Sequence, residues 1–197
     1  SAVLRSRGAV VGRLVANLRP LDPTVGTWSE RLLAAPLSGG IRYNGPADTL
    51  FSFSGITNQN LSGAIGIAAD FSCRVQAPCL NGVVRGQNMT YENLAFGTKL
   101  TKMDVAGRFD GNALQIDNLT ARAWDGRLSA KGRIGLAAEQ GYPLDLNIDL
   151  KQAQLAKSDA MAASATGSLR LTKTGMEAPL LSGTIRLPET RYKIVRE

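Results

Sequence analysis

The sequence predicts a mainly β protein, built from antiparallel strands joined by short turns, with one or two short helices. Apolar and polar residues alternate with a period of two through much of the chain, which places every second side chain on one face of a sheet. The 21 glycines among 197 residues favour turns and β-structure over long helices. Dipeptides typical of tight turns stand between the alternating runs.

The first 60 residues are expected to form strands and two short helices. Residues 8–18 follow a strand pattern. Residues 24–35 and 46–54 break the alternation, and each resembles a short amphipathic helix. The second helix is expected to open at Asn44 or Gly45, with Pro46 at an early helical position. Residues 61–197 are expected to form one continuous run of strands, and the two parts together a single structural unit that is a fragment of a larger protein.

The alternation is clearest from Leu144 to Lys151, where four large aliphatic residues point one way and four polar residues point the other. Leu169 and Leu171 repeat the pattern in a later strand, and further runs behave in the same way. One face of these runs carries Leu61, Gly63, Ile65, Ile67, Ala69, Phe71 and Cys73, then Leu128, Ala130, Gly132, Ile134 and Leu136, then Leu181, Gly183, Ile185 and Leu187.

Three dipeptides predict hairpin turns: Asn81-Gly82, Asp110-Gly111 and Asp125-Gly126. Residues 152–165 are rich in Ala, Lys and Ser, and their pattern fits either a loop or a turn of helix. Leu-Ser-Gly phrases recur at irregular spacing, which argues against a strict solenoid and suits a meandering sheet.

The net charge of +7 and the pI near 9.8 fit a solvated basic outer face, with attraction to anionic membranes as the second interpretation. Basic residues are spread along the chain, so no basic stripe indicates a nucleic-acid partner. Aromatic residues make up only 6% of the chain, which disfavours binding of sugars or single-stranded nucleic acid by stacking.

The residues that common catalytic sites need are missing from the sequence. It has no histidine, so catalysis by a Ser-His-Asp or Cys-His arrangement is excluded. Asp145 and Asp149 fit the polar face of a strand better than a glycosidase pair. Two cysteines without a histidine are too few ligands for zinc, and the isolated glycines form no phosphate loop. We therefore expect no enzymatic activity, metal or cofactor.

Cys73 and Cys79 flank a five-residue connection that contains Pro78. A hairpin end could bring them within bridging distance, and two reduced thiols are the alternative. A disulfide is the favoured interpretation if the protein resides in an oxidising compartment.

The order of several phrases resembles the TamB family, the inner-membrane subunit of the translocation and assembly module in bacteria with two membranes. The phrases are LSGAIGIAADFSCRVQAPCLNGVV, TARAWDGRLSAKGRIGL, YPLDLNIDLKQAQL and ATGSLRLTKTG, followed by LLSGTIRLPETRYKI. The resemblance covers residues 61–195 well and the first 60 residues more loosely. Two features depart from the family pattern: Trp124-Asp125-Gly126 replaces a turn of small residues, and the cysteine pair is not a family hallmark.

The resemblance implies a long sheet curled into an open apolar groove, whereas the alternation alone fits a closed sandwich equally well. It also implies a periplasmic segment of an inner-membrane protein whose anchor lies outside this sequence. No run approaches the roughly 18 apolar residues that span a bilayer, and the start lacks a signal-peptide pattern. The residues expected to line the groove are Leu61, Ile65, Ile67, Phe71, Leu128, Ile134, Leu144, Leu146, Ile148, Leu150, Leu169, Leu171 and Ile185.

Three functions are open at this point. The first is a conduit that shields phospholipid acyl chains between the two membranes, with a TamA-like or barrel-assembly protein as the outer-membrane partner. The second is a scaffold that offers sheet edges to outer-membrane protein precursors. The third is a secreted sandwich or stalk without a ligand.

Overall fold

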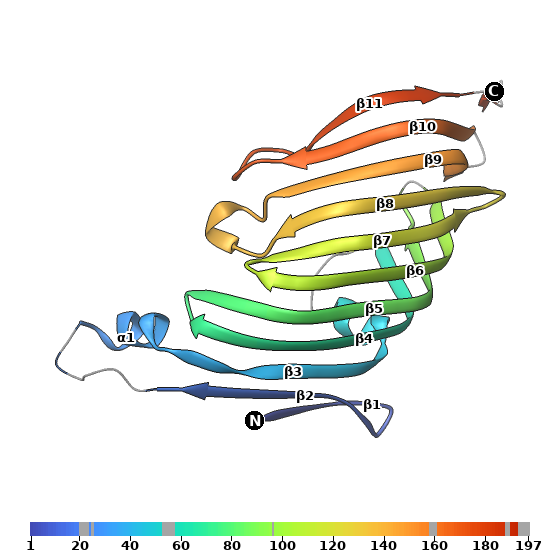
Figure 1. The fold of residues 1–197 in the computed structure, drawn as a ribbon. Helices are drawn as coiled ribbons and strands as arrows, with labels where there is room; N and C mark the ends of the chain where they lie inside the picture. The colour runs from blue at the N-terminus through green and yellow to red at the C-terminus, as the bar shows by residue number, and fades with distance from the viewer. Residues whose placement is uncertain are drawn as a thin grey trace, which may run out of the picture.

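The computed structural model describes residues 1–19, 24, 26–52, 58–95, 97–157, 161–187 and 190–192. Eleven strands form one antiparallel sheet in sequence order, so each strand pairs with its neighbours in the chain (Figure 1). A twelfth strand, β12, pairs with β10. The strands are β1 (Ala2–Ser6), β2 (Ala9–Leu18), β3 (Leu37–Pro46), β4 (Gln59–Arg74), β5 (Ala77–Asn93), β6 (Thr98–Gly111), β7 (Ala113–Ala123), β8 (Gly126–Gly135), β9 (Leu144–Lys157), β10 (Met161–Lys173), β11 (Leu180–Arg186) and β12 (Thr190–Tyr192).

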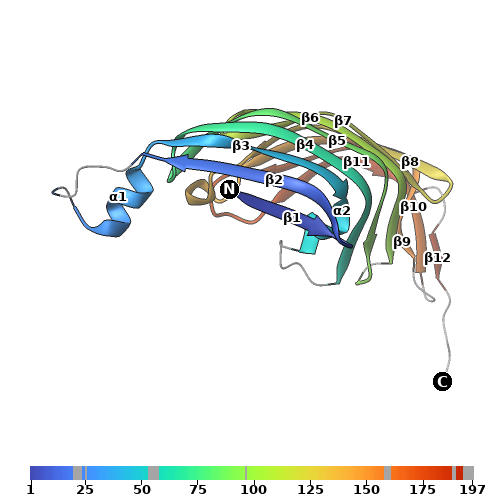
Figure 2. The ribbon, with the colours of Figure 1, turned by 90° about the horizontal axis from the view of Figure 1, so that it is seen from below.

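The sheet is arched into an open trough, and its two edges do not meet (Figure 2). This confirms the expected mainly β, open architecture. Within the described ranges every strand belongs to this one sheet, so the closed sandwich is wrong.

The arch bends sharply along a line of β-bulges that crosses several strands. Asn88 of β5, Lys102 of β6 and Gln152 of β9 have φ angles of +48°, +47° and +50°, and each lies where the strand register shifts. A bulge places an extra residue in one strand, which bends that strand and increases its twist. Because the bulges occur at similar positions in several strands, the whole sheet curls at one end of the trough.

Two short α-helices are present where helices were expected, and the first is shorter than predicted. α1 (Trp28–Ala34) begins at a capping box, in which the Thr27 hydroxyl accepts from the Glu30 backbone N–H and the Glu30 carboxylate accepts from the Thr27 backbone N–H. α2 (Ala47–Phe51) has Pro46 itself as its N-cap, so the expected opening at Asn44 or Gly45 is wrong. The end of the second predicted helix lies outside the described residues.

The turn predictions are confirmed at two positions and wrong at one. Asp110-Gly111 and Asp125-Gly126 lie at the β6–β7 and β7–β8 hairpins. Asn81-Gly82 instead lies inside β5, opposite Asp70 and Ala69 of β4. Glycine is favoured at position 82 because a Cβ atom there would overlap the Ala68 carbonyl oxygen and Ala69 of the adjacent strand.

Residues 152–165 form neither a loop nor a helix over their described part, since β9 continues to Lys157 and β10 begins at Met161. The small side chains that made this segment ambiguous have a packing role. Ala153 is 0% exposed and Ala165 is 4% exposed, and they lie opposite each other inside the bend.

Buried apolar residues form two clusters, and each combines alanines with one or two larger side chains. The first contains Ala47 of α2 with Met89, Met103 and Ala121, so α2 packs against the sheet beneath the arch (Figure 2). The second cluster contains Ala123, Leu150, Ala153 and Ala165.

Candidate functional site on the concave face

The strand register brings the predicted lining residues together in cross-strand rows. Across β8 and β9, Leu128 lies opposite Leu150 and Ile134 lies opposite Leu144. The rows continue into β10 and β11. There Ile148 lies opposite Leu169, Leu146 lies opposite Leu171, and Gly167 lies between Leu150 and Ile185.

The predicted residues of β4 belong to the same face. Ile65, Ile67 and Phe71 lie opposite Gly86, Val84 and Leu80 of β5, and these rows continue into β6 at Val105, Gly107 and Gly111. Leu61 and Ile65 pack against the buried cluster that contains Ala47 of α2.

Sequence reasoning missed the lining residues of the middle and first strands. In β5 to β7 the bulges interrupt the period-two signal, so its runs are short and irregular. The missed residues on this face are Leu14, Ile41, Tyr43, Leu80, Val84, Met89, Tyr91, Leu100, Met103, Val105, Phe109, Leu114, Ile116 and Leu119.

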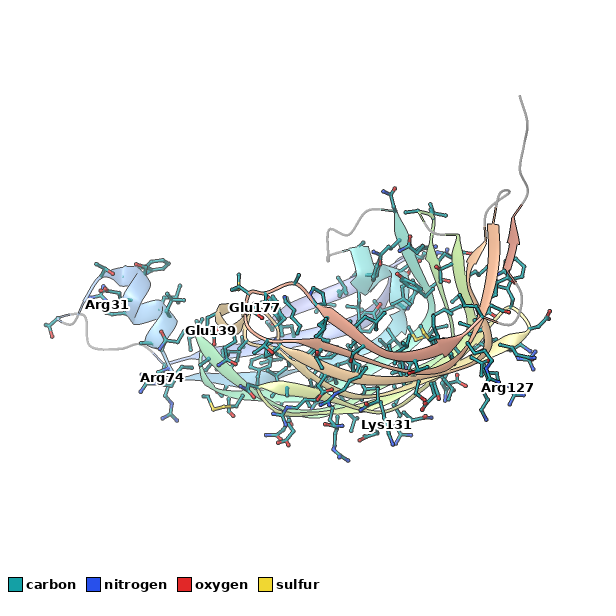
Figure 3. All side chains as sticks on the ribbon, turned by 90° about the horizontal axis from the view of Figure 1, so that it is seen from above. Arg31, Arg74, Arg127, Lys131, Glu139 and Glu177 are labelled. Atoms are coloured by element: carbon teal, nitrogen blue, oxygen red, sulfur yellow. A yellow bond between two sulfur atoms is a disulfide. The ribbon has the colours of Figure 1, made fainter. Side chains whose placement is uncertain are left out.

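The apolar face is the concave one. Ala47 of α2 packs on it, and α2 lies beneath the arch (Figure 2). The opposite face carries the polar residues, and Figure 3 shows Lys131 of β8 extending from the convex side. Lys131 lies opposite Asn147, which alternates along β9 with Leu146 and Ile148. The acidic residues Asp145 and Asp149 share that outward face.

Exposure varies along the trough because the sheet is covered only in part. Leu150, inside the bend, is 2% exposed, whereas Ile185 and Leu181 on β11 are 44% and 56% exposed. The concave surface near β10 and β11 is therefore accessible to a ligand without any rearrangement of the fold.

Polar groups on the concave face are hydrogen-bonded within the protein. The Tyr43 hydroxyl donates to the Pro46 carbonyl at 2.6 Å, and the Tyr91 hydroxyl donates to Gln59 Oε1 at 2.8 Å. At the rim, Lys173 Nζ donates to the Gly141 carbonyl at 2.5 Å. In the described part of the chain, every buried side-chain nitrogen and oxygen has a partner.

The two cysteines form a disulfide at the β4–β5 hairpin, with their Cα atoms 5.5 Å apart. Cys73 lies opposite Pro78, and Cys79 lies opposite Ser72, so the bridge joins residues one position apart in register. It closes the end of the hairpin, away from the bend.

Ion pairs lie on the convex face. The Asp145 carboxylate accepts from Arg170 Nε at 2.8 Å and from Arg170 Nη2 at 2.6 Å. These hydrogen bonds, aided by the positive charge of Arg170, lower the pKa of Asp145. Among the described residues, the acidic and sulfur-bearing side chains form no group that could hold a metal ion.

Residues 117–197 match the family model of the TamB C-terminal domain. These residues belong to the TamB family. They include most of β7, all of β8 to β11 and thus the cross-strand rows around Leu146 and Ile148. Comparisons of the chain with curated proteins and with solved structures found no match.

This match over residues 117–197 supports a TamB-family role in membrane-associated transport or assembly, and the TamB family is a non-enzymatic module. The family implies interaction with TamA and with membrane lipids or proteins in general. Over the described residues, no helix combines the length and apolar character needed to cross a bilayer.

Proposed function

We propose that this segment is a lipid conduit in the periplasm, whose concave face shields phospholipid acyl chains in transit between the inner and outer membranes. The observation that carries the proposal is the continuity of the apolar face. Cross-strand rows of aliphatic residues and glycine extend from β3 to β11, and the charged residues of these strands, apart from Lys173 at the rim, alternate with them on the convex side.

The energetic need for such a surface follows from the hydrophobic effect. Moving an acyl chain into water costs about 0.8 kcal/mol per CH₂, or on the order of 20 kcal/mol for a whole phospholipid. An open aliphatic trough removes most of that cost while the charged headgroup stays in water. The chain therefore needs no catalytic residue to accelerate transfer.

A conduit must also release its cargo, which requires a surface without strong local binding sites. The two tyrosines of the concave face, Tyr43 and Tyr91, use their hydroxyls in internal hydrogen bonds. Leucine, isoleucine, valine and glycine offer contacts that a lipid chain can exchange for identical contacts one strand further on. This uniformity favours sliding along the sheet over capture at one point.

Site-specific photocrosslinking tests the proposal, because adjacent positions on β9 face opposite sides. A photoreactive residue at Leu146, or at Leu169 on the facing strand, should crosslink phospholipid in cells. The same residue at Asn147 is the matched control and should crosslink little. Native mass spectrometry of the purified chain should also find phospholipid bound. Equal crosslinking from both faces, with no lipid bound to the purified chain, would exclude the conduit.

A second function, a scaffold for outer-membrane protein precursors, is favoured by one observation. All seven residues of β11 (Leu180–Arg186) are exposed, and among the strands that the structure describes β11 pairs only with β10. A precursor strand could pair with this edge by main-chain hydrogen bonds. A photoreactive residue at Thr184 would then crosslink precursor protein, whereas a conduit crosslinks lipid from Leu146 and Leu169.

A further inference from the structure

The convex face carries an unusual row of basic side chains on the outside of the bend. Arg122 of β7 lies directly opposite Arg127 of β8, and Arg127 lies directly opposite Lys151 of β9. Lys102 of β6 comes from the neighbouring bulge, where its φ is +47°. Figure 3 shows Arg127 on the outer side of the sheet, near its curled end. We call these four residues the basic row.

Placing like charges directly opposite each other destabilises a sheet, because the Cβ atoms are only about 5 Å apart. Elsewhere on the convex face several cations pair with acidic residues of nearby strands, including Arg42, which lies opposite Arg13. Arg42 pairs with Asp70 at 2.7 Å, and Arg170 pairs with Asp145 at 2.6 Å. Within the described residues, no side chain of the basic row has such an ion pair.

The basic row surrounds a hollow of about 400 Å³. The hydroxyl-bearing side chains of Thr120 and Ser129 also line it, between the cations. One carboxylate, that of Asp149, reaches the hollow, and it accepts a hydrogen bond from the Ser168 hydroxyl at 2.5 Å. The hollow is thus lined by four cations and one carboxylate, and that carboxylate already accepts a hydrogen bond from Ser168.

We propose that the basic row is a binding site for a phosphate-type oxyanion that carries two negative charges. Two facing guanidinium groups provide several N–H donors in the planar arrangement that suits phosphate oxygens, and the lysines add charge. The bound anion would offset the repulsion between Arg122, Arg127 and Lys151. This site lies on the opposite face from the proposed lipid path, so it is independent of that function.

The first test separates specific binding from general screening by salt. The melting temperature of the 197-residue chain is measured in phosphate and in chloride at equal ionic strength, because both screen surface charges. Phosphate should raise it more than chloride does. Arg127→Gln should abolish this difference, and Lys131→Gln, four residues along the same face and opposite the neutral Asn147, should preserve it.

The variants also test the repulsion itself. In dilute chloride, Arg127→Gln removes the central charge of the row and should raise the melting temperature by about 1–4 °C. A lower melting temperature would mean that the row is not under electrostatic strain. That result, or an equal response of the wild-type chain to phosphate and chloride, would overturn the proposal.

The source of the oxyanion is resolved with vesicles. Vesicles of phosphatidylcholine with and without phosphatidic acid, whose headgroup is a phosphomonoester, are floated with the wild-type chain, Arg127→Gln and Lys131→Gln. Capture that requires phosphatidic acid and Arg127, and persists in Lys131→Gln, identifies a membrane headgroup. A phosphate effect on stability without such capture identifies a soluble phosphate compound.

Discussion

Ile148 of β9 lies directly opposite Leu169 of β10, and both side chains pack against the buried cluster of Ala123, Leu150, Ala153 and Ala165. The two residues thus belong both to the concave surface and to the margin of the core. A charged substitution at Ile148 therefore tests whether water reaches this part of the concave face.

Ile148→Asp should lower the free energy of unfolding by about 1–3 kcal/mol, because it removes apolar packing and places a carboxylate beside the cluster. Asn147→Asp adds the same charge to the convex face and should change it by less than about 0.5 kcal/mol. Urea denaturation of both variants provides the measurement. Complete loss of folding in Ile148→Asp would indicate a closed, dry core at this position.

Leu181→Asp should leave the fold intact while it reduces lipid binding. Leu181 lies opposite Leu171 on the concave face but is 56% exposed, so its carboxylate remains hydrated. We expect a change in unfolding free energy below about 0.5 kcal/mol and a clear loss of co-purified phospholipid by native mass spectrometry. Unchanged lipid content would argue against a path near β11.

Gly132→Ala should destabilise the chain by about 1–3 kcal/mol. Gly132 has a φ of +150°, and an added methyl group would overlap the carbonyl of Asp145 on the adjacent strand. Gly66→Ala is the control, since its new methyl group would have no neighbour closer than 3.9 Å. It should be neutral or stabilising by up to about 1 kcal/mol. Equal melting temperatures of the two variants would contradict this packing.

Reduction of the disulfide should have only a modest effect on stability. Cys73 and Cys79 are six residues apart in a hairpin that the β4–β5 ladder already closes. Loop-closure entropy sets the loss at no more than about 2 kcal/mol. After export, thiol labelling of the denatured chain without reductant should modify neither cysteine. Full labelling of both residues would rule out the bridge in the exported protein.

Asp145 should contribute to the pH dependence of stability. Its pKa is lowered by the hydrogen bonds from Arg170, so its contribution is present above the unfolded-state pKa of about 3.9 and is lost as pH falls through the folded-state value. The melting temperature of the wild-type chain should therefore exceed that of Asp145→Asn by a constant margin above about pH 5. The margin should shrink below about pH 4. A margin independent of pH would show that the carboxylate charge is not involved.

The alternation of residues predicted the faces of the strands correctly wherever it ran unbroken. From Leu144 to Lys151 the period of two alone determines which side chains share the concave face, because β8–β9 pairing contains no register shift. The same reasoning placed Leu61, Ile65, Ile67 and Phe71 on one side of β4.

The curl of the sheet could not be predicted in this way. Asn88, Lys102 and Gln152 bend the sheet through left-handed backbone angles, and none of them is a glycine that would mark the site. The basic row was missed for a related reason. Arg122, Arg127 and Lys151 look scattered along the chain, and only the hairpin registers align them.

The strictly sequential strand order has a consequence for how the protein is made. Each strand from β2 to β11 pairs with the strand that precedes it, so this part of the sheet can form one strand at a time from its first hairpin during synthesis. Strands β2 to β11 need no partner that is distant in the sequence. During synthesis, the edge of the last strand formed is the one that awaits its partner. Such a sheet has no preferred number of strands, and inserting another hairpin would lengthen the trough without requiring any existing pairing to change.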